Sequence, residues 1–219
     1  MDNQNKLAAL DVKRLVGIAM FAALAYATTF VFRIPVQFLT FDAKDAILTI
    51  AAFIYGPSAA VTMALIPALI EFITISDTGL WGLVMNFVSS ASFSFTASLI
   101  YKYKRSFNGA MIGIYAAVIA TTAIMIPMNI FVTPVYMGVP RQAVIELLPT
   151  LLIPFNFAKA LMNAAITMLI YKPVSLAMKR ARLIPGKVDV SFNKQSLIML
   201  IAGVITLAAA VTVFIILKS

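Results

Sequence analysis

The side chain with the clearest chemical potential is a lysine within an apolar stretch. Lys159 is the only charged residue between positions 147 and 171. An ammonium group at mid-membrane costs about 2.5–3.5 kcal/mol on insertion scales, so its position needs a reason. Asn156 and Asn163 lie three residues before and four residues after it, on the same helical face. The pattern predicts a pocket in which amide and ammonium donors bind a polar molecule.

An alternative reading gives these side chains a purely structural role. Lys159 would then extend to the headgroup region, and the asparagines would bond neighbouring helices. Asn129, just after Pro127, and Asn86 are further amides in apolar surroundings, and each fits either reading by itself. Taken together they predict a polar pocket. Because Asn129 and Asn156 lie toward the outer ends of their helices, the pocket is expected to open outward.

The segment 38–45 joins two apolar stretches on the predicted outer side and mixes apolar and charged residues. It can act as a lid over a pocket. It can also be an ordinary connector in which Asp42 or Asp45 accepts the free N–H groups at the start of the next helix, and Asp45 is the favoured cap. The two roles are compatible.

Several kinds of chemistry are absent from the sequence. The chain has no cysteine and no histidine, which excludes disulfides, thiolate chemistry, the usual zinc sites and histidine acid–base catalysis. No phosphate-binding loop of the G-x-x-x-x-G-K-[ST] type occurs, so active transport would need an ATP-hydrolysing partner. An intramembrane enzyme would have to use Asp42, Asp45 and Glu71, which are not spaced as a metal site. No resident cofactor is expected. If the protein were a stand-alone transporter coupled to an ion, Glu71 would be the candidate coupling residue.

Composition indicates that the elements holding these residues are transmembrane helices. Of the residues, 62% are hydrophobic and 11% are charged, whereas soluble domains carry roughly 25% charged residues. The apolar stretches each approach or exceed the roughly 20 residues of a membrane crossing. They are Leu15–Phe32, Ala46–Ile75, Gly79–Tyr101, Phe107–Pro140, Leu147–Tyr171 and Ser196–Leu217. The sequence predicts an all-α integral membrane protein.

The stretch 46–75 is too long for one crossing. As a single helix it would measure about 45 Å, against a hydrocarbon core of about 30 Å. Gly56-Pro57 lies in its middle and predicts a tight turn between two short helices. Further helices are expected at about 108–131 and 148–171, joined by an outer loop that contains Pro134 and Pro140. These helices form a six-helix body.

The distribution of basic residues sets the expected orientation. The basic clusters are Lys6, Lys13 and Arg14; Lys102, Lys104 and Arg105; and Lys172, Lys179, Arg180, Arg182, Lys187 and Lys194. Because cytoplasmic loops are rich in Lys and Arg, these clusters place the N-terminus in the cytoplasm. The net charge of +9 is thereby accounted for by topology, and no nucleic-acid partner is expected. The expected location is a membrane that the chain crosses several times.

The chain divides into a membrane body and an appended helix. Residues 1–178 form the predicted six-helix domain, 179–195 a basic cytoplasmic linker, and 196–219 an additional transmembrane helix. The last helix carries no charge between Ser196 and Leu217, which favours anchoring or packing over ligand binding. If it spans the membrane, the C-terminus is outside.

Small residues recur every four positions on the first helix. Ala19, Ala23 and Ala27, together with Ala22 and Gly17, predict a stripe where another helix approaches closely. Packing within the chain and docking of another subunit both remain open on this pattern alone.

These features together resemble the substrate-binding S components of energy-coupling-factor (ECF) vitamin transporters, over roughly residues 10–180. The riboflavin-specific branch is the most similar. The segment 39–45 resembles that branch's first outer loop, and Tyr55-Gly56-Pro57 resembles its turn. Gly82 and Asn86 resemble its fourth helix, and Pro154-Phe155-Asn156 with Lys159 is the most specific match.

The resemblance implies a function for each matched residue. Asn129, Asn156 and Lys159 would bond the polar edge of a flavin ring, with Leu39, Thr40 and Gly82 beside the ligand. Ala19, Ala23 and Ala27 would dock on a transmembrane coupling subunit that is bound to two ATPases. The expected function is capture of riboflavin from outside and its release inward, and the resemblance implies that this occurs in the cytoplasmic membrane of a bacterium. The alternatives are another vitamin or flavin-like ligand on the same scaffold, and a stand-alone secondary transporter.

Overall fold

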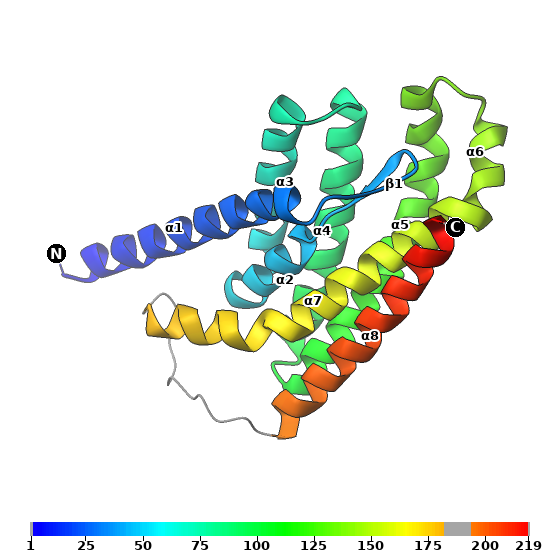
Figure 1. Ribbon diagram of the computed structural model, residues 1–219. Helices are drawn as coiled ribbons and strands as arrows, with labels where there is room; N and C mark the ends of the chain where they lie inside the picture. Colours follow the sequence, from blue (N-terminus) through cyan, green and yellow to red (C-terminus); the bar gives the residue numbers. More distant parts are fainter. Residues whose placement is uncertain (1, 182–193, 219) are drawn as a thin grey trace.

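A computed structural model describes residues 2–181 and 194–218 as a bundle of helices with one small β-hairpin (Figure 1). In chain order the elements are α1 (Asp2–Val31), β1 (Ile34–Val36), β2 (Leu39–Phe41), α2 (Lys44–Tyr55), α3 (Pro57–Thr74), α4 (Gly79–Tyr103), α5 (Phe107–Met137), α6 (Arg141–Leu147), the π-helical segment Leu148–Leu152, α7 (Ile153–Arg180) and α8 (Lys194–Lys218). The helical class predicted from composition is confirmed. Most of the predicted linker 179–195 lies outside the described residues.

Within the described chain, 6 helical segments are long and apolar enough to cross a membrane. They are α1, α3, α4, α5, the continuous segment 141–180, and α8. The protein is therefore a multi-pass membrane protein. In contrast, α2 has 12 residues, or about 18 Å at roughly 1.5 Å per residue, which is too short to cross about 30 Å of hydrocarbon. The predicted short helix before the turn is therefore present, but it is not one of the segments long enough to cross a membrane by itself.

The predicted break at Gly56-Pro57 is confirmed. Gly56 has a φ of +92°, a conformation that side chains disfavour, and it ends α2. Pro57 is the first residue of α3, where its missing N–H would be unpaired in any helix. The turn therefore divides the long apolar stretch into a short helix and one that can span the membrane.

The loop after α1 contains a hairpin that the sequence analysis missed. Strands β1 and β2 pair antiparallel, with Ile34 opposite Phe41 and Val36 opposite Leu39. Gln37 has a φ of +53° in the turn between them. Val36 and Phe41 are each only 1% exposed, so packing on the helices stabilises the short strands. An isolated hairpin of this length would be marginal at best.

Two helices extend beyond the ends predicted from sequence. Helix α5 continues to Met137, past Pro127 and Pro134, and stops at Gly138, whose φ is +65°. Helix α7 continues to Arg180, and the helical path before it begins at Arg141. Proline is a weaker stop signal here because other groups in a membrane bundle can satisfy the carbonyl that proline leaves free. The predicted loop residue Pro134 is therefore helical.

Helix α2 lies at the centre of the bundle and is buried from Lys44 through Phe53. Small side chains on α4 leave room for it, because Ser90, Ser94 and Ser98 recur every four residues and are nearly inaccessible. Their hydroxyl groups bond to carbonyls or to a side chain, so they add little polar cost. This packing places the first turn of α2 deep inside the protein.

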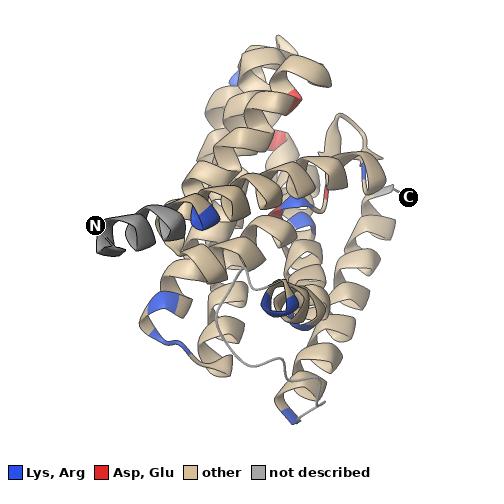
Figure 2. Cartoon of the chain, turned by 90° about the vertical axis from the view of Figure 1, so that its left-hand side faces the viewer, with Lys and Arg blue, Asp and Glu red and all other residues tan. Residues whose placement is uncertain are grey.

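Helix α8 lies along α7 on the outside of the bundle (Figure 1). Figure 2 shows the charge distribution: the coloured acidic residues lie in the upper half of the view, and the lower half carries only basic ones. The chain thus has one end with mixed charges and one end that is basic.

Candidate ligand-binding site

Ionisable residues from distant parts of the chain meet inside the bundle and form what we call the ion cluster: Asp42, Lys44, Asp45, Glu71 and Lys159. Each is at most 6% exposed. The loop after β2, the first turn of α2, the last turn of α3 and the second turn of α7 supply them. Isolated charges in such a setting would be very costly, so the pairing of each one decides what it can do.

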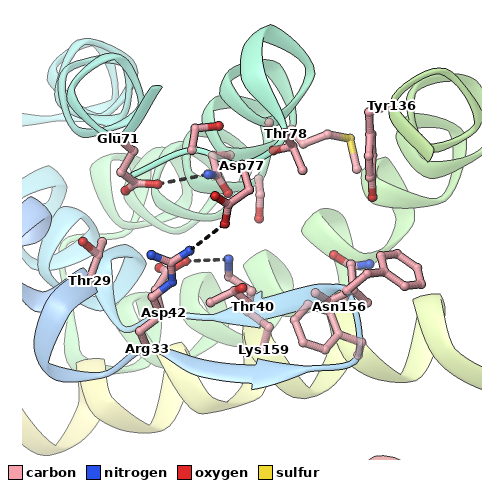
Figure 3. A pocket seen from close by; sticks show the side chains of 18 of the residues that line it. Thr29, Arg33, Thr40, Asp42, Glu71, Asp77, Thr78, Tyr136, Asn156 and Lys159 are labelled. Carbon is pink, nitrogen blue, oxygen red and sulfur yellow. Dashed lines mark hydrogen bonds and ion pairs between the residues drawn. The ribbon is translucent and has the colours of Figure 1, made fainter. Parts of the chain in front are cut away.

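Lys159 is paired with an acidic group of its own chain. Its Nζ lies 2.9 Å from the Asp42 carboxylate, 117 positions away in sequence (Figure 3). The ammonium is therefore held inside the protein and does not extend to the headgroups. The sequence argument had a bound molecule supply its acceptors, but Asp42 already supplies one. The ammonium has three N–H donors, and this bond uses one of them.

Lys44 is held more tightly than Lys159. Its Nζ lies 2.8 and 2.9 Å from the two carboxylate oxygens of Glu71, and 3.4 Å from Asp42. Asp42 therefore lies between two ammonium groups. Burial opposes its ionisation, but the charges of Lys159 and Lys44 outweigh burial and hold the pKa of the Asp42 carboxyl well below its usual range.

Of the two aspartates predicted to cap α2, the favoured one, Asp45, is wrong. Asp45 lies in the first turn, inside the helix, and its carboxylate accepts a hydrogen bond from the Ser90 hydroxyl. The residue that precedes the helix is Ala43, which has no side-chain cap. Instead Asp42 accepts the N–H of Lys44 at 3.3 Å. A capping side chain must come before the first helical residue, and α2 begins one position earlier than Asp45.

The predicted asparagines divide into two kinds. Asn163 bonds the Ala46 N–H at 3.0 Å and the Asp42 carbonyl at 3.1 Å, so it joins α7 to the start of α2 and is a structural bridge. Asn129 and Asn156 each donate one amide N–H to a carbonyl four residues earlier in their own helix. Asn86 donates to Glu71 at 3.0 Å and links α4 to α3. Asn129, Asn156 and Asn86 still face a shared space.

That space is a cavity of about 210 Å³ bordered by α1, the hairpin, α4, α5, α7 and the connection between α3 and α4. Apart from Asn163, the residues predicted to bind the ligand line it: Leu39, Thr40, Gly82, Asn86, Asn129, Asn156 and Lys159. Phe38, Met85, Met125 and Phe155 provide apolar surface. The structure therefore brings the predicted residues together, and their contact with a ligand stays a prediction.

The cavity also has lining residues that the sequence analysis did not select. Arg33, at the end of α1, reaches toward Asp77 in the connection between α3 and α4, at 3.9 Å (Figure 3). Thr29 and Thr78 add hydroxyl groups, and Tyr136 adds a ring from α5. Tyr136 was missed because α5 was predicted to end before it. Arg33 and Asp77 were counted only as loop charges, although both directly follow apolar helices.

The alanine stripe on α1 is exposed. Ala19, Ala23 and Ala27 all lie on the open face of the helix, next to Met20 and Leu24, which are 51% and 48% exposed. Ala22 and Gly17 belong to the opposite, buried face, and Gly17 packs against Tyr55. The stripe predicted from sequence thus separates into two faces. The inner face packs against α2 and α3, and the outer face is left exposed by the described part of the chain.

The arrangement does not favour catalysis by the acidic residues. No group of at least 3 His, Cys, Asp or Glu side chains placed to hold a metal occurs in the described part of the chain. Asp42 and Glu71 are neutralised by lysines, and Asp45 bonds to Ser90. The site can bind a neutral molecule that has hydrogen-bond acceptors and an apolar body.

A family model described as "ECF transporter, substrate-specific component" matches residues 13–171 of the chain. The protein is an ECF transporter S component. This S component is 32% identical over 190 residues to the riboflavin transporter RibU of Staphylococcus aureus (strain TCH60), covering 82% of this chain and 100% of that protein. A solved structure titled "Structure and mechanism of the S component of a bacterial ECF transporter" superimposes with a TM-score of 0.66 at 32% identity, over 78% of this chain and 99% of the other.

Membership in this family defines the kind of protein. An S component is the substrate-binding part of a membrane transporter and is not an enzyme. The family model covers α1 through most of α7, and with them every residue that lines the cavity. Helix α8, which begins at Lys194, lies beyond the matched residues.

Proposed function

We propose that this S component binds riboflavin from outside the cell and delivers it inward. The observation that carries the proposal is that seven predicted ligand residues, from Leu39 to Lys159, line one cavity. The similarity to a riboflavin transporter over that protein's full length supports it. Riboflavin has an apolar ring system, a polar ring edge with carbonyl acceptors, and a chain of hydroxyl groups. The cavity offers a complement to each of these parts.

The proposed contacts follow from the chemistry of the lining. Lys159, Asn156 and Asn129 bond the polar edge of the ring, since ammonium and amide groups donate to carbonyl oxygens. Phe155, Leu39 and the two lining methionines contact the ring faces. The hydroxyl groups of Thr29 and Thr78, which also line the cavity, bond the chain of hydroxyl groups on the ligand. No bond in the ligand is made or broken.

The position of the cavity supports capture from outside. Arg14, Lys102 and Arg105 lie together beside the Gly56-Pro57 turn, at the end of the bundle away from the cavity. If this basic end is cytoplasmic, the cavity opens outward and the N-terminus is inside. The cavity is smaller than the roughly 300–1,000 Å³ of most small-molecule sites. We therefore propose that the hairpin moves outward to admit riboflavin and closes over it.

The experiment that tests the ligand is identification of what the purified protein carries. Protein extracted from cells grown with riboflavin is expected to be yellow, and ligand-free protein is expected to quench the fluorescence of added riboflavin at a one-to-one ratio. Other vitamins serve as competitors. Colourless protein that leaves riboflavin fluorescence unchanged would overturn the choice of ligand, and competition by another vitamin would identify the replacement.

We propose further that the outer face of α1 docks on a transmembrane coupling subunit energised by two ATPases. The exposed, small side chains of Ala19, Ala23 and Ala27 support close helix approach. The variant Ala23→Trp is expected to bind riboflavin but to lose co-purification with the coupling subunit. Ile119→Trp, at a 69% exposed position on α5, is the control. Riboflavin uptake into vesicles that contain this chain alone would instead support a stand-alone transporter.

A further inference from the structure

Helix α8 packs antiparallel along α7, and two contacts fix its first half. Lys172 bonds the Ser196 hydroxyl at 2.9 Å, and Gly203 lies against Leu169. A third connection joins Tyr115 of α5 to Thr206 at 2.8 Å. These contacts give α8 a defined position on the bundle, although it lies outside the residues that the family model matches.

The last turns of α8 reach the wall of the cavity. Phe214 is 8% exposed, and its ring packs edge-on against Phe41 at 5.4 Å and Phe155 at 5.9 Å between ring centroids. Phe155 lines the cavity and precedes Asn156, and Phe41 precedes Asp42, the partner of Lys159. A single ring of α8 therefore contacts both the hairpin and the first turn of α7.

One face of α8 is specialised for this contact. Met199, Thr206, Ala210 and Phe214 are at most 8% exposed, and their spacings of seven, four and four place them on one side of the helix. Ile215, next to Phe214, is 64% exposed. If anchoring were the only role of α8, the helix would not need to place a buried aromatic ring between two structural elements of the cavity.

We propose that Phe214 is a positioning residue that holds the β1–β2 hairpin against α7 and thereby slows ligand release. Strands this short need outside packing, and Phe214 completes a buried cluster that includes Val36 and Phe41 of the hairpin. Weakening this cluster frees the hairpin without touching the polar lining. The part of the proposal that concerns ligand release rests on the proposed riboflavin function. The part that concerns hairpin order does not.

The first test is amide hydrogen exchange on the full-length, ligand-free protein. Phe214→Ala is expected to speed exchange in residues 34–41 by about tenfold, because it opens a void beneath the hairpin. Ile215→Ala is the matched control and is expected to leave exchange unchanged. Phe214→Leu keeps most of the apolar volume and is expected to restore most of the protection. Unchanged exchange in Phe214→Ala, or an increase spread equally over α7 and α8, would overturn the proposal.

The second test measures riboflavin kinetics on the same variants. Phe214→Ala is expected to raise the dissociation rate about tenfold, with the association rate and the number of binding sites per protein within about twofold of wild type. A purely structural role would lower the number of competent sites and leave the rate unchanged, and that result would overturn the positioning role. If wild-type protein binds no riboflavin, the proposed function fails, while the exchange experiment still decides whether Phe214 holds the hairpin.

Discussion

Lys44 and Lys159 are buried ammonium groups beside the same Asp42 carboxylate, but their surroundings differ. Both oxygens of Glu71 bond to Lys44, at 2.8 and 2.9 Å, and Lys44 is absent from the lining of the cavity. Lys159 has Asp42 as its hydrogen-bond partner among the described residues and does line the cavity. Burial of a lysine therefore does not by itself identify a binding group. What matters is how many acceptors the protein already provides and whether the ammonium borders open space.

The two lysines also divide the ion cluster into regions with different roles. The region around Lys44 joins the start of α2 to α3 and α4, through Glu71 and Asn86, which also border the cavity. The region around Lys159 joins α7 to the loop after β2 and forms part of the cavity wall. We expect a change at Lys44 to act mainly on folding and a change at Lys159 to act mainly on binding.

The largest effect is expected for Lys44→Met. This change leaves Glu71 without a cation and Asp42 with only one, so it should destabilise the fold by about 3–5 kcal/mol, the usual cost of breaking a buried pair. The measurement is the yield of monodisperse protein and its thermal unfolding midpoint. Wild-type stability with lost riboflavin binding would break the comparison, because it would give Lys44 the role assigned to Lys159.

The next effect is expected for Lys159→Met, which keeps the apolar stem and removes the charge. Asp42 keeps Lys44 as a partner at 3.4 Å, so the protein should still express and fold. Riboflavin binding should weaken by about ten- to a hundredfold, since a hydrogen bond from a charged donor is worth roughly 1.5–3 kcal/mol and its loss leaves a ligand acceptor unpaired. Fluorescence titration beside a thermal melt measures both properties. Unchanged affinity would require the pocket assignment to be abandoned.

A matched pair of amides sharpens the same comparison along one helix face. Asn156→Ala is expected to weaken riboflavin binding about tenfold and to leave the thermal midpoint unchanged, because its amide faces the cavity. Asn163→Ala leaves the Ala46 N–H and the Asp42 carbonyl unpaired, and should lower stability by about 1–3 kcal/mol. Equal effects of the two variants on both properties would contradict the division of α7 into a binding part and a structural part.

The smallest effect is expected for Arg33→Gln, a change at a lining residue in the loop after α1. Its contact with Asp77 is 3.9 Å long, and the Asp77 side chain is 94% exposed, so the pair contributes little to stability. Riboflavin affinity is expected to stay within about twofold of wild type. A stopped-flow measurement would show whether the association rate changes. A large loss of affinity would mean that Arg33 binds the ligand directly.

Much of the fold could be predicted because it depends on local features. Transmembrane helices follow from long apolar runs, and the break at Gly56-Pro57 follows from backbone preferences of two adjacent residues. The hairpin could not be predicted, because its short strands are stable only where Val36 and Phe41 are buried by distant helices. The end of α5 was missed because the bundle tolerates two prolines that usually signal a stop.

The candidate site divides in the same way. Asn156, Lys159 and Asn163 were placed on one helical face from spacing alone, and all three lie on the face of α7 directed toward the hairpin and α2. Spacing could not tell that Asn163 bridges to α2 while Asn156 borders the cavity, since the two positions differ only in what packs opposite them. Tyr136 was missed because it lies beyond the predicted end of its helix.

The sequence by itself determined that the protein is a membrane protein and that its long apolar segment breaks at Gly56-Pro57. It also determined which helix carries a buried lysine between two asparagines. These properties depend on composition and on residues within a few turns of one another. Only the tertiary structure decided that Asp42 meets Lys159 and that Glu71 holds Lys44. These partners lie 117 and 27 positions apart, so no local pattern encodes their pairing. The pairs form because packing of the helices removes water from the charges, and each charge must then find its counter-charge inside the protein.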